Sequence, residues 1–251
     1  MKNKDVVFTA MLGNYESLNE IEVAKDSTCL FYCFTDNPEL KSETWEIKHI
    51  SPAVPGDSAR SSRAVKMLGH KDFPPDTRSL YIDNTVKLLA DPTEILDSWL
   101  ANGPLAFMEH TKRRSVRREF LACSAYGLDD PEVIYRQFQY YKELYPEILD
   151  QKPFWGGMIA RVSNSVVDKF MDEWFFHNAK FSRRDQLAIN ASSHISGTRI
   201  VTVDGVNDFS KWHQWPIITA RDVASRQTIP NSRFRKGIIA ANYVRFAPRF
   251  L

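Results

Sequence analysis

The hydrophobic and polar residues of the first half alternate in a pattern typical of strands followed by helices. Short apolar runs predict buried strands at residues 6–12, 28–35, 45–50, 80–82 and 104–108. A helix is predicted from residue 58 to about 68 behind a cap at Asp57, and another behind Asp91-Pro92. Strands that alternate with helices indicate an α/β fold with a mostly parallel sheet.

The second half follows a more irregular pattern. Helices are predicted at residues 130–144 and 166–175, a further helix opens at 182–187, and strands are predicted at 154–162 and 199–203. No internal repeat or linker separates the halves, so we expect one mixed α/β domain over residues 1–251.

Composition and charge narrow the class of protein. Hydrophobic residues make up 43% of the 251 residues and charged residues 25%, which are ordinary values for a globular protein. A formal net charge of +2 favours no nucleic-acid partner. The three cysteines are too few and irregular for a disulfide framework, and the first apolar run is too short for a signal segment. We therefore expect a cytoplasmic protein with buried thiols.

Polar side chains lie in or just beyond the predicted strands of the first half. Thr9 with Tyr15, Asp36, and the pair Asp83-Asn84 occupy these positions. If the strands are parallel neighbours, their carboxyl ends meet in one crevice, where an aromatic ring stacks on a base and a carboxylate bonds a ribose. The alternative is a set of unrelated turns after strands.

Charged residues near these positions suit an anionic ligand. Asp83 follows a buried strand, where its carboxylate is placed to hold Mg²⁺ or Mn²⁺ and, through the ion, a diphosphate. Arg60, Arg63 and Lys66 are spaced three apart on the first predicted helix and form a cationic stripe. A surface stripe of this kind is more often simply solvated.

Other candidates come from the second half and its boundary. Gly156-Gly157 inside a strand pattern indicates a bulge or a closely approaching sugar ring. Asp185 lies beside Arg184 at a helix start, where it either compensates the helix dipole or serves an anionic ligand site. His110 and His213 are each either structural or ligand-binding. No glycine-rich phosphate loop or nucleophile elbow occurs.

The ordered set of these motifs resembles a glycosyltransferase-like family, formerly a domain of unknown function. It occurs in plant cell-wall and mucilage proteins and bacterial polysaccharide clusters, and is distantly similar to glycogenin-type transferases of the GT-A fold. The resemblance covers roughly residues 5–190 and rests on Thr9-Ala-Met-Leu-Gly-Asn-Tyr15, Cys33-Phe-Thr-Asp-Asn37, Arg60, Arg63, Lys66, His70, Tyr81-Ile-Asp-Asn-Thr85, His110 and Ser182-Arg-Arg-Asp-Gln-Leu187.

The resemblance implies a nucleotide-sugar donor and a divalent metal held at an Asp-x-Asp-type motif. This chain departs from that motif. If Asp83 is the first acid, Thr85 replaces the second; if Asp83 is the second, Tyr81 replaces the first. The family's Asp-Gln pair matches Asp185-Gln186, which implies a role near the transferred sugar.

We therefore predict a GT-A-like glycosyltransferase that moves a hexosyl or pentosyl group from a nucleotide-diphosphate sugar to a glycan or lipid-linked acceptor. The alternative is a non-catalytic nucleotide-sugar or glycan-binding protein. Residues 1–110 would form the nucleotide-binding half and 111–251 the acceptor and sugar half. We expect Asp185 to be catalytic and Mn²⁺ or Mg²⁺ to be held by Asp83, with His213 as a second ligand. The expected donor-binding residues are Thr9, Tyr15, Asp36, Arg60, Arg63, Lys66, Asn84, His110, Gly156, Gly157, Arg184 and Gln186.

Two basic stretches complete the expectations. Residues 112–118 carry five lysines and arginines, and residues 221–251 carry seven against one acid. The second stretch is expected to contact the anionic donor or acceptor, and an anionic membrane surface is a further candidate partner.

Overall fold

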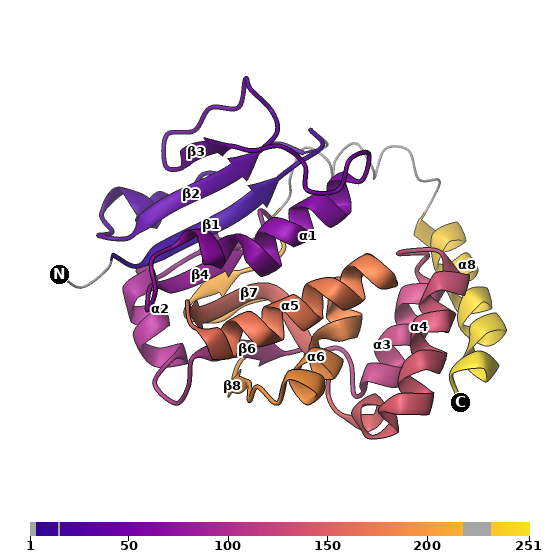
Figure 1. The fold of residues 1–251 in the computed structure, drawn as a ribbon. Helices are drawn as coiled ribbons and strands as arrows, with labels where there is room; N and C mark the ends of the chain where they lie inside the picture. Colours follow the sequence, from indigo (N-terminus) through magenta and orange to yellow (C-terminus); the bar gives the residue numbers. More distant parts are fainter. Residues whose placement is uncertain (1–3, 15, 218–231) are drawn as a thin grey trace.

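A computed structural model describes residues 4–14, 16–217 and 232–251. Its centre is a seven-stranded sheet with the order β3-β2-β1-β4-β7-β6-β8 (Figure 1). The strands are β1 (Val6–Met11), β2 (Leu30–Thr35), β3 (Glu46–His49), β4 (Arg78–Ile82), β6 (Leu105–Glu109), β7 (Phe154–Val162) and β8 (Val201–Val203). A small second sheet pairs β5 (Lys87–Leu88) with β9 (His213–Gln214).

All strand pairs of the main sheet are parallel except the two that β7 makes with β4 and β6. Strand β1 is buried along its whole length, as expected of a central strand covered on both faces. The predicted fold class is confirmed: this is a mostly parallel, mixed sheet flanked by helices, as expected of a GT-A-like domain.

Helices cover both faces of the sheet. They are α1 (Ser58–Leu68), α2 (Pro92–Trp99), α3 (Val116–Ala125), α4 (Pro131–Leu144), α5 (Ser165–Lys180), α6 (Ile189–Ser196) and α8 (Ser232–Phe246). Short 3-10 turns are η1 (Glu22–Lys25), η2 (Gly69–Asp72), η3 (Pro146–Asp150), η4 (Asp185–Ala188) and η5 (Ala247–Phe250). Figure 1 shows α1 and α5 side by side on one face. No helix in the described ranges has the length and apolar character needed to cross a bilayer.

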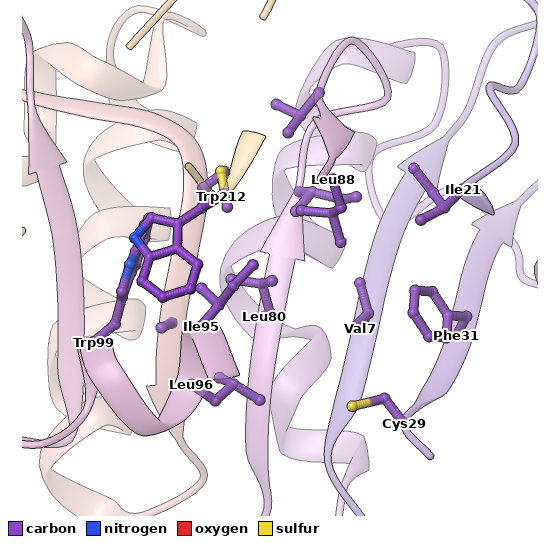
Figure 2. Packing of buried hydrophobic residues seen from close by; sticks show 14 of the residues in the cluster. Val7, Ile21, Cys29, Phe31, Leu80, Leu88, Ile95, Leu96, Trp99 and Trp212 are labelled. Carbon is purple, nitrogen blue, oxygen red and sulfur yellow. The ribbon is translucent and has the colours of Figure 1, made fainter. Parts of the chain in front are cut away.

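Two apolar layers hold the sheet between its helices. On the α2 face, Leu80 packs with Val7 and with Ile95, Leu96 and Trp99 of the helix (Figure 2). On the opposite face, the next residues along each strand face α1 and α5 instead. The strict alternation follows from the two-residue period of a strand, and it fixes the direction of the side chains at each strand end.

A third core lies at one end of the sheet, where α3, α4 and α8 pack together (Figure 1). Helix α3 was not among the predicted elements, because its basic residues hide the apolar face of Val116, Phe120 and Cys123. These residues follow the spacing of one helix face, and Ser115 caps the helix by accepting a hydrogen bond from the Arg118 amide.

Strand β7 is irregular where it carries its two glycines. The pairing with β6 shifts between Phe107, which faces Ile159, and Met108, which faces Trp155. Gly156 and Gly157 lie in the extra length of β7, so the predicted bulge is confirmed. The bulge lies beside the end of β4, since the Asp83 amide donates to the Gly157 carbonyl at 2.9 Å.

Candidate active site

The carboxyl ends of β2, β1 and β4 lie next to one another, because these strands are parallel neighbours. The strands are thus parallel neighbours, which was the condition for their polar ends to meet in one crevice. Asp36 follows β2 and accepts a hydrogen bond from the Gly13 amide beyond β1, at 3.0 Å. Asn37 donates to Asn14 at 2.9 Å across the same gap. Asp83 follows β4 on the same edge.

Asp83 is held in a defined orientation at the end of β4. Its Oδ1 accepts hydrogen bonds from the Tyr81 hydroxyl at 3.0 Å and from the Lys66 ammonium at 3.3 Å. Its side chain is 32% exposed, so it faces both the protein and the solvent. Tyr81 lies in β4, two residues before Asp83, and its ring lies on the face to which the Asp83 carboxylate turns.

Asp185 is the second aspartate that Lys66 contacts. The Lys66 ammonium, 1% exposed, donates to Asp185 Oδ2 at 2.5 Å. Arg63, one turn earlier on α1, places its Nε 3.2 Å from the same oxygen. The indole of Trp174 on α5 donates to the Asp185 carbonyl at 2.8 Å and anchors the η4 turn. Two carboxylates and two cations from three separate segments, α1, the end of β4 and η4, therefore meet at one point.

The charges around Asp185 determine its protonation state. Burial opposes ionisation, but the positive charges of Arg63, Lys66 and Arg184 outweigh it and hold the pKa of Asp185 well below its usual range. Asp185 is therefore an anion near neutral pH. A carboxylate with so low a pKa accepts hydrogen bonds well but is a weak general base.

Because Gly156 has no side chain, the Lys66–Asp185 ion pair can lie close to the β7 backbone. A Cβ at this position would lie 3.2 Å from Lys66 Nζ and 3.5 Å from Asp185 Oδ2. The close approach of the β7 backbone to a buried ion pair explains why the strand tolerates glycine here. The predicted bulge is present, and the group that lies close to Gly156 is the Lys66–Asp185 pair; the approach of a sugar ring stays a prediction.

A second polar cluster adjoins Asp185. The side-chain NH₂ of Gln186 donates a hydrogen bond to Glu119 Oε1 at 3.1 Å. Arg113 Nε lies 2.8 Å from Glu119 Oε2. His110 lies close to this pair: burial lowers its pKa, while the charge of Glu119 partly opposes that shift. Glu119 and Arg113 were not among the predicted site residues. The signal in the sequence is a lone acid in a basic stretch, placed on the apolar face of α3.

A comparison with protein families connects this geometry to a known group. The model of the TOD1/MUCI70 glycosyltransferase-like domain matches residues 2–204. The chain belongs to this family. The resemblance predicted from the strand-end motifs and the Asp185-Gln186 pair is thereby confirmed.

One relative of the TOD1/MUCI70 family is the probable hexosyltransferase MUCI70 of Arabidopsis thaliana. It is 29% identical over 211 residues, which cover 74% of this chain and 36% of that protein. The chain thus spans about a third of the length of this curated relative.

Solved structures with a similar chain path include several glycosyltransferases. The bifunctional glycosyltransferase WbbM has a TM-score of 0.45 and 12% identity, and covers 80% of this chain and 38% of its own. Mouse xyloside xylosyltransferase 1 has a TM-score of 0.43 and 10% identity over 80% of this chain and 85% of its own. Galactosyltransferase LgtC, solved in complex with donor and acceptor sugar analogues, has a TM-score of 0.43 and 13% identity. The match covers 80% of this chain and 73% of LgtC.

Several residues predicted to bind the donor are buried or bonded within the protein. Thr9 is fully buried inside β1, short of the strand end, so it does not reach the crevice in this arrangement. Arg60 donates to the carbonyls of Asn178 and Phe181, at 3.2 and 2.7 Å, and pairs with Asp57. It therefore joins α1 to the end of α5. Tyr15 lies outside the described residues.

Asn84 and His213 are also fully engaged. The Asn84 side chain accepts from the Asn19 amide at 2.8 Å and donates to the Ser17 carbonyl at 2.9 Å, which fastens the loop after β1. His213 is buried, with its Nε2 2.8 Å from the Asn207 carbonyl and its Nδ1 2.8 Å from Ser210 Oγ. Neither ring nitrogen has a lone pair free for a metal ion, so the role expected for His213 does not follow from this arrangement.

Of the two side chains predicted to bind a metal ion, Asp83 and His213, only Asp83 remains a candidate. Among the described residues, no three His, Cys, Asp or Glu side chains gather as a metal site. Thr85, in the place of a second acid, accepts a hydrogen bond from the Trp215 indole at 3.0 Å. Within the described chain, Asp83 Oδ2 carries no hydrogen bond and its side chain reaches solvent. One carboxylate oxygen fits Mg²⁺ or Mn²⁺ when phosphates and waters supply the other ligands.

The basic stretch at residues 112–118 is largely paired with acids. Lys112 lies 2.7 Å from Asp208 and Arg117 lies 3.3 Å from Asp150. Of the basic C-terminal stretch, residues 221–231 lie outside the described part. Arg249 forms a bidentate pair with Glu132 at 2.6 and 2.8 Å.

Proposed function

We propose that this chain transfers a glycosyl group from a nucleotide-diphosphate sugar to a glycan-type acceptor. Family membership supports glycosyl transfer in general. The observation that carries the proposal for this chain is the meeting of Asp83, Lys66, Asp185 and Arg63 at the carboxyl edge of the sheet. Ligands of open α/β sheets bind at that edge. The name of the Arabidopsis relative supports a hexosyl group.

The proposed roles follow from charge and exposure. Arg63 and Arg184 carry positive charge to the solvent side of the site and offset the charge that develops on the leaving diphosphate. Lys66 is buried, and it holds both aspartates in place. Asp185 is a fixed negative charge beside the transferred sugar, which accepts hydrogen bonds from the sugar or stabilises positive charge on it. Asp36 is the candidate for the ribose or base.

We further propose that Asp83 holds a divalent ion that arrives with the donor. The second oxygen of its carboxylate is the protein ligand, and the bound ion would offset charge on the diphosphate. A single carboxylate binds such an ion weakly, so donor and ion are expected to bind cooperatively.

A screen of nucleotide sugars by thermal unfolding tests the proposal. Each donor is added with Mn²⁺ or with a chelator, and a ligand that binds only the folded state raises the melting temperature. A donor at a hundred times its dissociation constant stabilises the protein by about 2.7 kcal/mol. Donors that bind are then assayed for hydrolysis and transfer. If no nucleotide sugar raises the melting temperature, the proposal is wrong.

A second candidate function is that of a binding protein without turnover. It is favoured by the single carboxylate at the strand end, since Thr85 stands where a second acid is expected. Such a protein would bind a nucleotide sugar in the same screen but would neither hydrolyse it nor transfer the sugar.

A further inference from the structure

Glu119 is a buried carboxylate that the proposed chemistry does not use. Its side chain is 4% exposed, and it lies on α3, far in sequence from Asp185. Its Oε1 accepts hydrogen bonds from the side-chain NH₂ of Gln186 at 3.1 Å and from the Cys123 thiol at 3.5 Å, and its Oε2 forms an ion pair with Arg113, whose Nε lies 2.8 Å away. Burial of a carboxylate is unfavourable unless it is paired and hydrogen-bonded. A buried, paired carboxylate next to the candidate site is therefore a candidate for a role in that site.

The contact fixes the orientation of the Gln186 side chain. A carboxylate paired with an arginine only accepts hydrogen bonds, so Gln186 must turn its NH₂ group toward Glu119. The amide is planar, and its carbonyl oxygen therefore points away from Glu119. The backbone of Gln186 is held as well, because its N–H donates to Asp185 Oδ1 at 3.1 Å.

We propose that Glu119 is a positioning residue, which holds Gln186 so that its side-chain carbonyl oxygen accepts a hydrogen bond from a hydroxyl of the transferred sugar. Arg113 pairs with Glu119, and Glu119 sets the orientation of Gln186. The inference rests on the proposed function for the sugar contact. The orientation of the Gln186 amide is a property of the protein alone.

The substitution Glu119→Gln tests whether residue 119 determines the orientation of the Gln186 side chain. The new amide would turn its oxygen toward the Arg113 guanidinium, because its NH₂ group and the arginine are both donors. Its NH₂ would then face Gln186, which must reverse to accept. Gln186 would present NH₂ instead of oxygen to the sugar, while the size of the side chain at position 119 hardly changes.

The experiment measures the protein and the reaction separately. The side-chain amide signal of Gln186 is assigned by ¹⁵N NMR from its disappearance in Gln186→Ala, and then followed in Glu119→Gln. Steady-state kinetics with the best donor compare Glu119→Gln, Gln186→Ala and the double variant. Tyr141→Phe is the matched control, since it removes a buried hydroxyl that contacts Gln137 and His177 in the same helical core.

We expect Glu119→Gln to shift the Gln186 amide signal and to lower kcat about tenfold, the loss of one hydrogen bond in the transition state, with a smaller change in KM. The double variant should be no slower than Gln186→Ala, because both changes remove the same contact. Tyr141→Phe should lower the melting temperature but leave kcat and the Gln186 signal unchanged.

Three results would overturn the inference. They are an unchanged Gln186 signal in Glu119→Gln, a lower melting temperature with unchanged kcat, and effects on kcat that multiply in the double variant. If the wild-type protein turns over no donor, the proposed function fails, while the amide signal still decides whether Glu119 orients Gln186.

Discussion

At the scale of single residues, Asp83 carries the proposed metal dependence. Asp83→Ala should abolish the enhancement of nucleoside-diphosphate binding by Mn²⁺, because it removes the carboxylate at the end of β4, whose Oδ2 carries no hydrogen bond within the described chain. Calorimetric titrations of the diphosphate, with Mn²⁺ and with a chelator, measure the enhancement. The fold should persist, since the side chain is partly exposed and fills little of the core.

Asp36→Ala is the contrast to this variant. It also removes an aspartate that follows a strand, but its carboxylate bonds the Gly13 amide and lies at β2 instead of β4. Its loss should weaken diphosphate binding to the same degree with and without Mn²⁺. Equal Mn²⁺ enhancement in wild type and Asp83→Ala would remove Asp83 from the metal site.

Asp185 is expected to act through its charge. Asp185→Asn keeps the shape of the side chain but removes the anion that pairs with Lys66 and Arg63. Transfer should fall by about a hundredfold or more, the effect of losing one preorganised electrostatic group, while donor binding persists. The free energy of unfolding should fall by about 3 kcal/mol, since the buried lysine loses its nearer partner. Turnover at the wild-type rate would contradict the proposed role.

A double variant separates stability from chemistry at this position. Lys66→Met combined with Asp185→Asn removes both charges of the pair, and replacing a buried pair with neutral groups is often tolerated. The double variant should therefore recover stability relative to Asp185→Asn in denaturant unfolding. Its transfer activity should remain lost.

At the scale of elements, the bulge of β7 ties the sheet to the ion pair. Gly156→Ala should lower the free energy of unfolding by about 1–3 kcal/mol, because its methyl group would enter the space of Lys66 and Asp185. Donor turnover should fall with it, since both charged groups must shift. Urea unfolding and kinetic assays measure the two effects.

Gly237→Ala is the matched control. Gly237 lies in α8, and a Cβ there would meet nothing within 4 Å. An alanine inside an exposed helix is favourable by up to about 1 kcal/mol relative to glycine. If Gly156→Ala is as harmless as Gly237→Ala, the close approach of β7 to the ion pair is not a constraint.

The elements that could be predicted from the sequence are those with local signals. Helix α1 begins and ends where its cap and apolar face predicted, and Asp57 accepts from the Arg60 amide as a capping residue does. Helix α3 was missed because its burial depends on packing against α4 and α8, which its charged sequence does not reveal.

The candidate site could be predicted only in part, because its contacts are between distant segments. Lys66 and Asp185 are 119 residues apart in the chain, and only the fold shows that they are partners. The same limit applies to His213. Its place beside tryptophans left both a structural and a ligand role open, with the structural role the commoner one, and only the fold shows its hydrogen bonds to Ser210 and Asn207.

At the scale of the whole molecule, the helical core connects the C-terminal region to the candidate site. Helix α3 carries Glu119 toward Gln186 and packs against α8. The η5 turn that follows α8 places Phe250, 2% exposed, among the rings of that core. Its ring centroid lies 5.0 Å from that of Phe138 and 6.4 Å from that of Phe120.

Phe250→Ala tests this connection. The substitution should lower the free energy of unfolding by about 3 kcal/mol or more, because it removes a buried aromatic ring and leaves a cavity between α3 and α4. Val244→Ala is the control: Val244 lies on α8 but is 78% exposed, so its loss should change stability by less than about 0.5 kcal/mol. Chemical denaturation measures both.

Because Glu119 lies on α3, one residue before Phe120, a loosened helix should also weaken the hold on Gln186. The Gln186 amide signal should therefore broaden or shift in Phe250→Ala and stay fixed in Val244→Ala. A folded Phe250→Ala protein with the expected loss of stability but an unchanged Gln186 signal would show that the helical core supports the fold without supporting the site.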